Sequence, residues 1–393
     1  MKTMKWKFYS LAFVAGMSIL TACSSDDNND NDGNGGNGNG NEIENGTILK
    51  GTITSDVTLA AGNTYKLSGE YIVEEGATLH IEEGVKIIAV YDDIADYILV
   101  KQGGKINAVG TPDKPIVMTS EKEEPGAWGG IHICGRAHTN AEGGKGSSEI
   151  GGAVYGGNDD ADNSGTLQYI RLEYTGFAFD EEHEANGISF YGVGNGTIVD
   201  HCQAYKGSDD GFEFFGGSVN VSNLVAVSCS DDSFDWTEGW NGKGTNLVAY
   251  QEAESTLGYD CDCLMECDNN GSHNAATPVA HPVLKNLILV GNGGSKQGIR
   301  LRAGTEVEID NAKVCGKGQP LTVETALTEN ALKNGTSKLT NITLTSELSS
   351  KEGIYTHADF IAVTSNKVDA NLSYSSFEDI RKECSWMNGS WVK

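Results

Sequence analysis

A short pattern of alternating apolar and polar positions recurs along the second half of the chain. Asparagine opens five of its seven copies. The copies begin at Tyr169, His201, Asn223, Asn246, Asn286, Asn311 and Asn341. Such alternation is typical of a strand with one buried face. Successive copies start 22 to 40 residues apart, and a repeat of this kind with insertions favours a stack of β coils over a β-sandwich.

A second apolar strand follows the first in several coils. Its copies are residues 187–192, 211–216, 233–237 and 298–304. In phase, the inward positions are Ile188, Phe212, Phe234 and Ile299, together with Phe190, Phe214, Trp236 and Leu301. Two strands repeating in phase predict an all-β fold, a single-stranded right-handed parallel β-helix over residues 45–393. Terminal coils expose strand edges, so we expect caps near residues 45–70 and 350–393.

The recurring asparagine is explained by a corner of the β-helix. Backbone amides and carbonyls at a turn need partners, and asparagine side chains stacked on successive coils can bond to them and to each other. Asparagine also tolerates the left-handed backbone conformation that a sharp corner needs. The sequence therefore predicts an asparagine ladder along one corner.

The N-terminus directs the chain to a membrane rather than adding to the fold. Lysines precede an apolar run, Leu11 to Leu20, that is too short to span a bilayer, which predicts a signal peptide at residues 1–22. The run ends in Leu20-Thr21-Ala22-Cys23, which resembles the lipobox of bacterial lipoproteins and implies lipidation of Cys23. Residues 24–41 hold only Ser, Asp, Asn and Gly, so we expect residues 23–44 to be a lipidated, flexible tether.

The tether indicates where the domain faces. Ser24-Ser25-Asp26-Asp27 is similar to the acidic export signal of Bacteroidetes surface lipoproteins, which implies a lipid-anchored protein on the outer surface of the outer membrane. The alternative is a lipoprotein on the periplasmic face with a polar spacer. Ordinary signal cleavage, with Cys23 as a bystander, is a further alternative.

Several segments resemble one family of secreted proteins. They are residues 126–131 (Gly-Ala-Trp-Gly-Gly-Ile), 208–217, 231–239 and 266–271 (Glu-Cys-Asp-Asn-Asn-Gly). The chain is similar here to a large family of bacterial β-helix lipoproteins, common in Bacteroidetes, whose fold belongs to the pectate-lyase-like superfold. The resemblance covers nearly everything after the tether, and it implies fold and secretion.

Composition and charge narrow the possible partners. The chain has 28 Lys and Arg against 55 Asp and Glu, for a net charge of -27. Binding to nucleic acid relies on Lys and Arg, so a nucleic-acid partner is excluded. The 51 glycines would weaken helix interiors, while a 38% hydrophobic content suffices for a core.

Outward positions of the second strand form two columns that could bind a ligand. One column holds Ser189, Glu213, Asp235 and Arg300, with Glu266 and His132 in the same phase. The next column holds Tyr191, Phe215, Thr237 and Arg302, with Asp268. Our candidate ligand-binding residues are Tyr191, Glu213, Phe215, Asp235, Glu266, Arg300 and Arg302.

These columns allow three interpretations. Carboxylates one rung apart can act as an acid–base pair, and in an enzyme this pair would be Glu213 and Asp235 with Arg300. The absence of the Gly-His-Gly and Arg-Ile-Lys motifs of polygalacturonases counts against this interpretation. Stacked aspartates before the strand are oxygen ligands suited to Ca²⁺. The candidates for this metal site are Asp209, Asp210, Asp231 and Asp232. In the third interpretation the columns are solvated ladders of paired charges.

Aromatic residues and one loop leave further alternatives. The side chains of Tyr191 and Phe215 should point outward beside the acidic column, where they either stack on a sugar or lie beneath an insertion loop. Trp240 is predicted in a loop. The run Asp180-Glu181-Glu182-His183-Glu184 is either a solvated turn or a metal ligand set.

The cysteines fit an oxidising compartment. Besides Cys23 there are eight, enough for up to four disulfides. Cys202 falls in an inward column and can be a core thiol. The run Cys261-Asp262-Cys263-Leu264-Met265-Glu266-Cys267 is not a standard zinc signature, so we expect disulfides that pin its loop, with soft-metal binding as the alternative.

Together these features predict a surface-exposed, non-catalytic lipoprotein that binds a glycan or an outer-membrane protein partner, with Ca²⁺ as a possible cofactor. The alternative from another class is a polysaccharide lyase or hydrolase that uses the same columns. A structural spacer or adhesin is the second alternative.

Overall fold

The computed structural model describes residues 41–92, 94–179 and 183–393. The predicted signal peptide, Cys23 and residues 24–40 of the predicted tether lie outside these ranges. No helix in the described ranges is both long enough and apolar enough to cross a membrane.

Strands dominate the described chain. The strands of the first half are β1 (Asn41–Ile43), β2 (Ile48–Ile53), β3 (Val57–Leu59), β4 (Thr64–Val73), β5 (Thr78–Ile81), β6 (Lys86–Ala89), β7 (Tyr97–Val100), β8 (Lys105–Val109), β9 (Ile116–Ser120), β10 (Ile131–Cys134), β11 (Gly146–Ser147), β12 (Val154–Tyr155) and β13 (Gly165–Glu173). Those of the second half are β14 (Ile188–Tyr191), β15 (Ile198–Tyr205), β16 (Phe212–Phe215), β17 (Asn220–Val227), β18 (Phe234–Thr237), β19 (Lys243–Tyr250), β20 (Met265–Cys267), β21 (Val283–Leu301), β22 (Glu308–Val323), β23 (Lys338–Leu344), β24 (Ser349–Ser350) and β25 (Lys367–Val368). The helices are α1 (Glu254–Leu257), α2 (Ala326–Asn334), α3 (His357–Ala362), α4 (Phe377–Glu383) and the 3-10 turns η1 (Glu142–Gly144) and η2 (Ser385–Met387).

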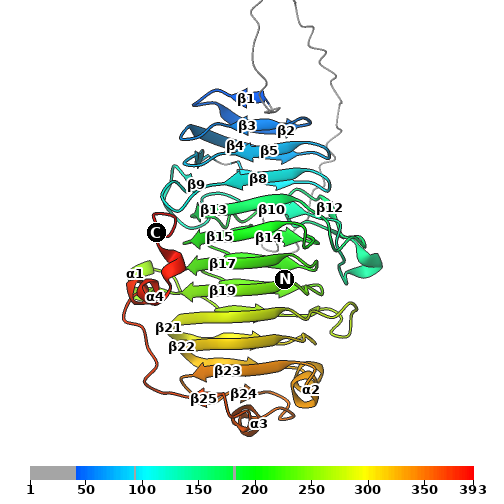
Figure 1. The fold of residues 1–393 in the computed structure, drawn as a ribbon, viewed down its shortest axis with the longest axis vertical. Coiled ribbons are helices and arrows are strands. Elements are labelled where there is room, and N and C mark those ends of the chain that lie inside the picture. The colour runs from blue at the N-terminus through cyan, green and yellow to red at the C-terminus, as the bar shows by residue number, and fades with distance from the viewer. Residues whose placement is uncertain (1–40, 93, 180–182) are drawn as a thin grey trace, which may run out of the picture. The chain divides into compact units, whose positions relative to one another are not determined.

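Parallel pairing between successive coils produces three ladders of strands, stacked as Figure 1 shows. Ladder A runs through β7, β10, β14, β16, β18 and β20 to the C-terminal parts of β21 and β22. Ladder B contains β5, β8 and the first halves of β13, β15, β17 and β19. Ladder C contains β6, β9 and the second halves of these same four strands, β13, β15, β17 and β19. The predicted parallel β-helix is confirmed.

The corner between ladders B and C lies at the residue that opens each sequence repeat. All seven of these residues have positive φ, between 52° and 63°. Asn246 Nδ2 donates to Asn223 Oδ1 (2.8 Å), Asn286 Nδ2 to Asn246 Oδ1 (3.0 Å), and Asn311 Nδ2 to Asn286 Oδ1 (2.9 Å). The predicted asparagine ladder is present, although Asn341 donates to Asp310 instead of continuing it.

Replacing a ladder asparagine tests this explanation of the corner. We expect Asn286→Ala to lower the free energy of unfolding by about 3–4 kcal/mol, because it loses two ladder hydrogen bonds of about 1 kcal/mol each, with Asn246 and with Asn311, and forces alanine into a left-handed conformation that costs about 1–2 kcal/mol. Asn286→Gly should lose only the hydrogen-bond part. Urea unfolding of both variants checks this, and equal losses would contradict the role of backbone conformation.

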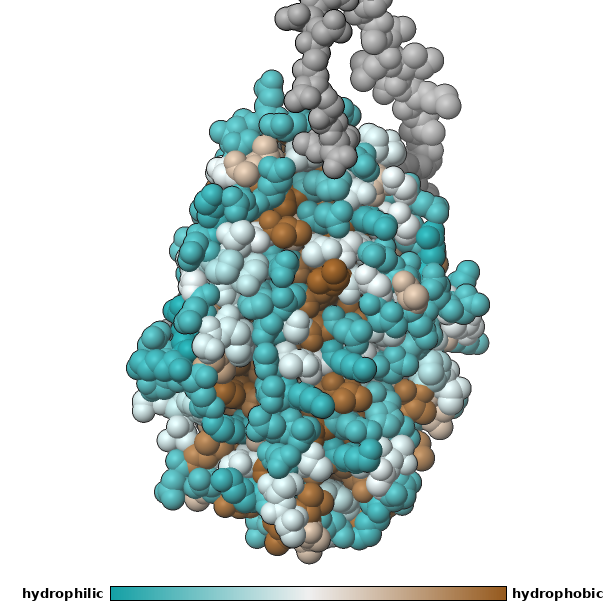
Figure 2. Space-filling model, viewed as in Figure 1, coloured by the Kyte–Doolittle hydropathy of each residue, from teal (hydrophilic) through white to brown (hydrophobic). Residues whose placement is uncertain are grey.

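The core is filled by side chains stacked between coils. Phe190 stacks on Phe214 with ring centroids 5.0 Å apart, and Phe212 on Phe234 at 5.6 Å. Trp240 lies in a loop, as predicted, but it turns back into the core and stacks on Phe214 at 4.1 Å. The predicted inward phase of ladder A is therefore correct. The visible outer face of the domain is mostly hydrophilic, with hydrophobic patches separated from one another (Figure 2).

The ends of the domain differ from the sequence prediction. β1 begins at Asn41, inside the predicted tether, and residues 48–73 already form coil strands rather than a cap. At the other end Phe360 of α3 packs into the core. Residues 369–393 form a C-terminal arm instead of capping the last coil: they return along the outside, and the C-terminus lies beside β13 and β15 (Figure 1).

Candidate functional site

The outward column of ladder A has the predicted composition. Parallel register places His132, Ser189, Glu213, Asp235, Glu266 and Arg300 next to one another in this order. The members with charged side chains from Glu213 to Arg300 are partly exposed. His132 is fully buried, and its Nε2 lies 2.7 Å from the carbonyl oxygen of Gly129. Ser189 is also buried, so the partly exposed part of the column begins at Glu213.

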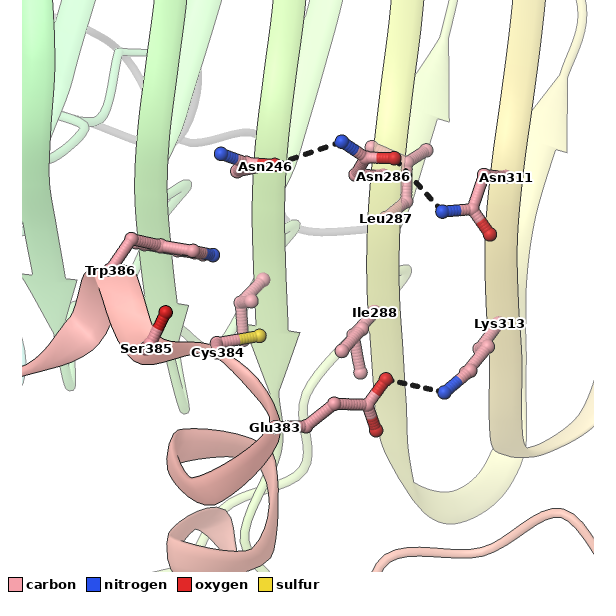
Figure 3. A pocket seen from close by; sticks show the side chains of 11 residues that line it. Asn246, Asn286, Leu287, Ile288, Asn311, Lys313, Glu383, Cys384, Ser385 and Trp386 are labelled. Atoms are coloured by element: carbon pink, nitrogen blue, oxygen red, sulfur yellow. Dashed lines mark hydrogen bonds and ion pairs between the residues drawn. The ribbon is translucent and has the colours of Figure 1, made fainter.

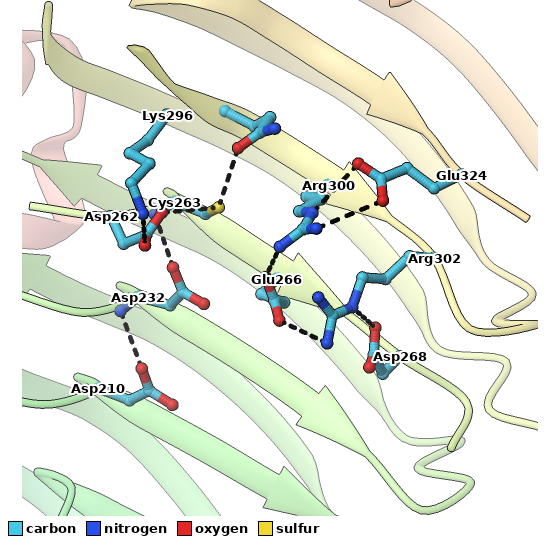
Figure 4. A network of polar contacts seen from close by, with 11 residues as sticks. Asp210, Asp232, Asp262, Cys263, Glu266, Asp268, Lys296, Arg300, Arg302 and Glu324 are labelled. Atoms are coloured by element: carbon cyan, nitrogen blue, oxygen red, sulfur yellow. Dashed lines mark hydrogen bonds and ion pairs between the residues drawn. The ribbon is translucent and has the colours of Figure 1, made fainter. Parts of the chain in front are cut away.

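The aspartates at the corner that precedes ladder A connect successive coils. Asp210 Oδ1 accepts a hydrogen bond from the backbone N–H of Asp232 (2.8 Å), and Asp232 Oδ1 accepts one from Cys263 (2.6 Å). Both side chains are buried. Figure 4 shows them in a row with Asp262. One oxygen of each carboxyl group thus holds the backbone, which leaves the other for a ligand.

Both arginines are held by carboxylates. Arg300 contacts Glu266 (2.8 Å) and Glu324 (3.2 Å), while Arg302 contacts Asp268 (2.7 Å) and Glu266 (3.0 Å). Burial lowers the pKa of Arg302, but the hydrogen bond and charge of Asp268 outweigh this effect and its pKa is raised. The arginine salt bridges extend to Glu266 and stop short of Glu213 and Asp235.

Glu213 and Asp235 are in a setting that disfavours their charge. Burial raises the pKa of both carboxyl groups well above the usual range, and neighbouring carboxylates raise it further: Asp235 acts on Glu213, and Glu266 on Asp235. Asp235 Oδ1 is enclosed and has no hydrogen-bond partner. Asn186, which is 1% exposed, donates from Nδ2 to Glu213 Oε2 (2.6 Å), and its own Oδ1 has no partner. Asp235 Oδ1 and Asn186 Oδ1 are therefore both free to accept a hydrogen bond or to bind a cation.

Two further carboxyl groups extend this region. Burial raises the pKa of Asp209 to about 7, with a contribution from Asp231. Burial also raises the pKa of Glu149 to about 7, against the hydrogen bond from Tyr191 that lowers it. A pKa near 7 means that both of these carboxyl groups exchange protons near neutral pH.

The carboxyl oxygens are close enough to share cations. Within each of three groups the ligand oxygens lie within 4.8 Å of one another. The groups are Asp209, Asp210 and Asp231; Asp210, Glu213 and Asp235; and Asp232, Asp235 and Glu266. Clustered carboxylate oxygens suit Ca²⁺. We call these seven carboxyl residues the acidic face. It contains all four predicted metal ligands and joins them to three predicted ligand-binding residues.

The role predicted for Tyr191 and Phe215 as exposed aromatics is wrong. Their side chains point outward in the predicted column, and their ring centroids stack 4.4 Å apart. Tyr191 is only 1% exposed and Phe215 7%, because the insertion that contains β11 and β12 covers them, with the Tyr155 ring 5.2 Å from Tyr191. They are not available to stack on a sugar at the surface, and the insertion-loop alternative holds.

Comparison with known domain families decides the classification. Residues 51–392 match the family described as "Pectate-lyase like beta helix domain". The chain belongs to this family.

The crystal structure of the Dettilon tailspike protein (gp208) is similar at 8% sequence identity and a TM-score of 0.29, over 76% of this chain and 56% of that chain. The match thus spans little more than half the length of the tailspike chain. No curated protein matches the sequence.

The cysteines of this pectate-lyase-like β-helix do not form the predicted disulfides. The eight cysteines of the described residues are free, buried thiols. They are distributed among separate packed regions: Cys202 lies in the core as expected, Cys134 lies beneath the insertion, and Cys315 on β22 packs in one cluster with Cys384 of the C-terminal arm. Packing therefore accounts for them without cross-links.

Two predicted metal ligand sets remain. Cys263 has its Sγ within 4.8 Å of ligand oxygens of Asp232 and Asp262, but Lys296 already forms an ion pair with Asp262. The other set is the run Asp180-Glu181-Glu182-His183-Glu184, of which residues 180–182 lie outside the described residues. Among the residues that the structure describes, the groups with metal-ligand spacing do not include Glu184.

The sequence analysis missed two residues of the site. Asn186 bonds Glu213 directly. It stands three residues before Ser189, as Asp210 stands before Glu213, so its phase along the coil was a signal that could have identified it. Glu149 comes from the insertion and reaches the site through its contact with Tyr191; an insertion has no phase along the coil, so only the folded chain shows this contact.

Proposed function

We propose that this chain is a non-catalytic, Ca²⁺-dependent glycan-binding protein, in which the acidic face holds the cation and the cation contacts the glycan. The observation that carries the proposal is the group of Asp210, Glu213 and Asp235, whose ligand oxygens lie within 4.8 Å of one another while the arginine salt bridges go elsewhere. A divalent cation would compensate these charges and satisfy the partnerless Asp235 oxygen.

The geometry favours binding over hydrolysis. Paired carboxyl groups of retaining glycosidases stand about 5–5.5 Å apart and those of inverting enzymes about 6.5–9.5 Å apart, with the scissile bond between them. Glu213 and Asp235 instead lie side by side on neighbouring rungs of one ladder, in the same outward column, and do not face each other across a space for the bond. Arg300 and Arg302 are already paired with carboxylates, which weakens the case for a lyase that needs a free arginine.

A glycan is the ligand class that fits such a cation. Ca²⁺ takes six to eight oxygen ligands, so a site formed by a few carboxylates at a partly exposed face leaves positions for hydroxyl or carboxylate oxygens of a sugar. The name of the family, with its reference to pectate lyases, also supports a carbohydrate ligand. Without the cation, the net charge of -27 would repel acidic polymers.

The location belongs to the same proposal. The signal sequence, the Leu20-Thr21-Ala22-Cys23 motif and the Asn-, Gly- and Asp-rich tether support a lipoprotein anchored through Cys23 in the outer membrane. The acidic Ser24-Ser25-Asp26-Asp27 segment supports exposure on the cell surface, as in the Bacteroidetes-type lipoproteins that the chain resembles. An outer-membrane protein partner for the glycan-loaded domain fits this setting.

A retention experiment tests the function. A soluble form carrying Cys23→Ser is passed over immobilised neutral and acidic polysaccharides, with 1 mM Ca²⁺ or with EDTA, and the size of each polymer is followed. We expect retention on at least one polymer that requires Ca²⁺, with no shortening. Because Glu213 and Asp235 supply the oxygens, Glu213→Gln with Asp235→Asn should weaken retention about tenfold or more, a loss of about 1.4 kcal/mol.

The control is Glu121→Gln, which removes a carboxylate from an exposed ion pair with Lys66. It should bind like the parent chain. Polymer shortening that disappears in the double variant would identify an enzyme and overturn the proposal. Absence of retention on every polymer would favour a spacer or a protein-binding role instead.

A further inference from the structure

The C-terminal arm forms a second pocket, away from the acidic face. The arm packs Ile380, Met387 and Trp391 against Val225, Val248 and Ile288 on the outer side of ladder C. Its end is fixed by Arg171, whose guanidinium donates to the carbonyl oxygen of Ser390 (2.7 Å), and by the Lys393–Glu173 ion pair (3.1 Å). Between the arm and the asparagine corner is a cavity of about 300 Å³.

The walls of this cavity differ in chemistry, as Figure 3 shows. The asparagine ladder forms one side, Trp386 and Ser385 of η2 form another, and Lys313 with Glu383 closes the far end. The Trp386 indole is partly exposed and extends toward Asn246, while its ring centroid lies 6.2 Å from that of Trp391, which supports it. The cavity thus combines an aromatic surface with a row of amides.

The amides have hydrogen-bonding capacity to spare. An asparagine side chain has two N–H donors and an oxygen with two lone pairs. In the ladder, Asn246 and Asn286 each use one N–H and one lone pair. One donor and one acceptor therefore remain on each amide, repeated along the pocket at the strand spacing of about 4.8 Å.

The charges at the pocket cancel. Lys313 forms an ion pair with Glu383, which also accepts a hydrogen bond from Tyr374 (2.9 Å). A charged ligand would have to break this pair, so the pocket suits an uncharged one. An aromatic face beside paired donors and acceptors matches a pyranose, which has an apolar C–H face and hydroxyl groups around its edge. The volume is at the lower end of ligand pockets, about 300–1,000 Å³, and fits a single ring.

We propose that this pocket binds one pyranose unit of a neutral glycan, with the ring on Trp386 and its hydroxyl groups on Asn246 and Asn286. This site lies on a different face from the cation site and does not rest on the function proposed for that face. With both sites, the domain would hold a glycan at two points, one dependent on Ca²⁺ and the other not.

Saturation-transfer NMR and tryptophan fluorescence test the pocket. The full chain, kept in EDTA so that the acidic face is silent, is titrated with the methyl glycosides of glucose, galactose, mannose and N-acetylglucosamine. We expect saturable binding of at least one of them. Trp386→Ala should weaken it about tenfold or more, and Asn286→Ala about threefold or more, by removing the stacking surface and one amide.

Asn341→Ala is the matched control. Asn341 has the same backbone conformation as Asn286 (φ 57° and 60°) and loses its side-chain hydrogen bond to Asp310, but it does not line the pocket. It should therefore bind like the parent chain while losing most of the stability that Asn286→Ala loses, since Asn286 gives up two ladder hydrogen bonds. No saturable binding of any of the four glycosides, or equal binding by Trp386→Ala and the parent chain, would overturn the inference.

Discussion

Adding Ca²⁺ to the chelator-treated chain is expected to stabilise it strongly at pH 8. A cation that binds only the folded chain adds about 2.7 kcal/mol when its free concentration is one hundred times Kd. The structural reason is that the acidic face concentrates seven carboxyl groups, with Asp210, Glu213 and Asp235 sharing one small volume. Thermal unfolding at several Ca²⁺ concentrations measures the effect, and Mg²⁺ serves as a comparison because it demands a tighter octahedral shell.

The pH dependence of the chelated chain has a definite sign. A carboxyl group whose pKa is raised by folding holds its proton more tightly in the folded chain than in the unfolded one. Its contribution to stability is complete below the unfolded pKa, near 4, and is lost as the pH rises through the folded pKa. For Asp209 and Glu149 the folded pKa is about 7, so the chelated chain should lose stability from about pH 4 to pH 8.

Ca²⁺ should remove the part of this loss that comes from the acidic face, which includes Asp209, because it replaces the protons that these carboxyl groups otherwise need. Its stabilising effect should accordingly be smallest near pH 5, where protons compete with it, and largest at pH 8. A Ca²⁺ effect that is independent of pH, or a chelated chain whose stability rises between pH 5 and pH 8, would contradict this account of the acidic face.

The double variant Glu213→Gln, Asp235→Asn is expected to have opposite effects on stability and on binding. Each amide has the size of the carboxyl group but no charge. In EDTA at pH 8 the variant should be more stable than the parent chain by about 1–3 kcal/mol, since an amide is free of the desolvation and charge repulsion that raise the pKa of both carboxyl groups. Its affinity for Ca²⁺ should fall about a hundredfold, or about 2.7 kcal/mol.

The stability measurement controls for misfolding in the binding measurement. A variant that fails to fold would be less stable than the parent chain, so lost binding together with raised stability can only come from the site. Glu121→Gln, at an exposed ion pair, should change neither property. A double variant that is less stable in EDTA and still binds Ca²⁺ would show that Glu213 and Asp235 form a structural ladder instead.

Periodic features of this chain could be predicted from the sequence, because each coil repeats the same environment. The corner asparagines, the inward phenylalanines and the register that aligns Glu213, Asp235 and Glu266 all follow from phase alone. The sequence also indicates that the predicted metal ligands lie next to this column, since Asp210 precedes Glu213 by the same number of residues as Asp232 precedes Asp235.

Features that depend on insertions could not be predicted. The burial of Tyr191 and Phe215 is determined by the β11–β12 hairpin, whose path is independent of the coil repeat. The C-terminal arm packs on ladder C through a few apolar residues, such as Ile380 and Trp391, that resemble any short amphipathic segment. The free thiols likewise follow from which coil each cysteine occupies, and cysteine counting alone suggested disulfides.

If the acidic face holds protons until a cation displaces them, Ca²⁺ binding must release protons. Calorimetric titration of Ca²⁺ into the chelator-stripped full chain at pH 6.5, in two buffers with different ionisation enthalpies, measures binding and proton release together. We expect saturable binding with protons released to the buffer in both titrations. Absence of binding, or binding with no difference between the buffers, would show that no such exchange takes place.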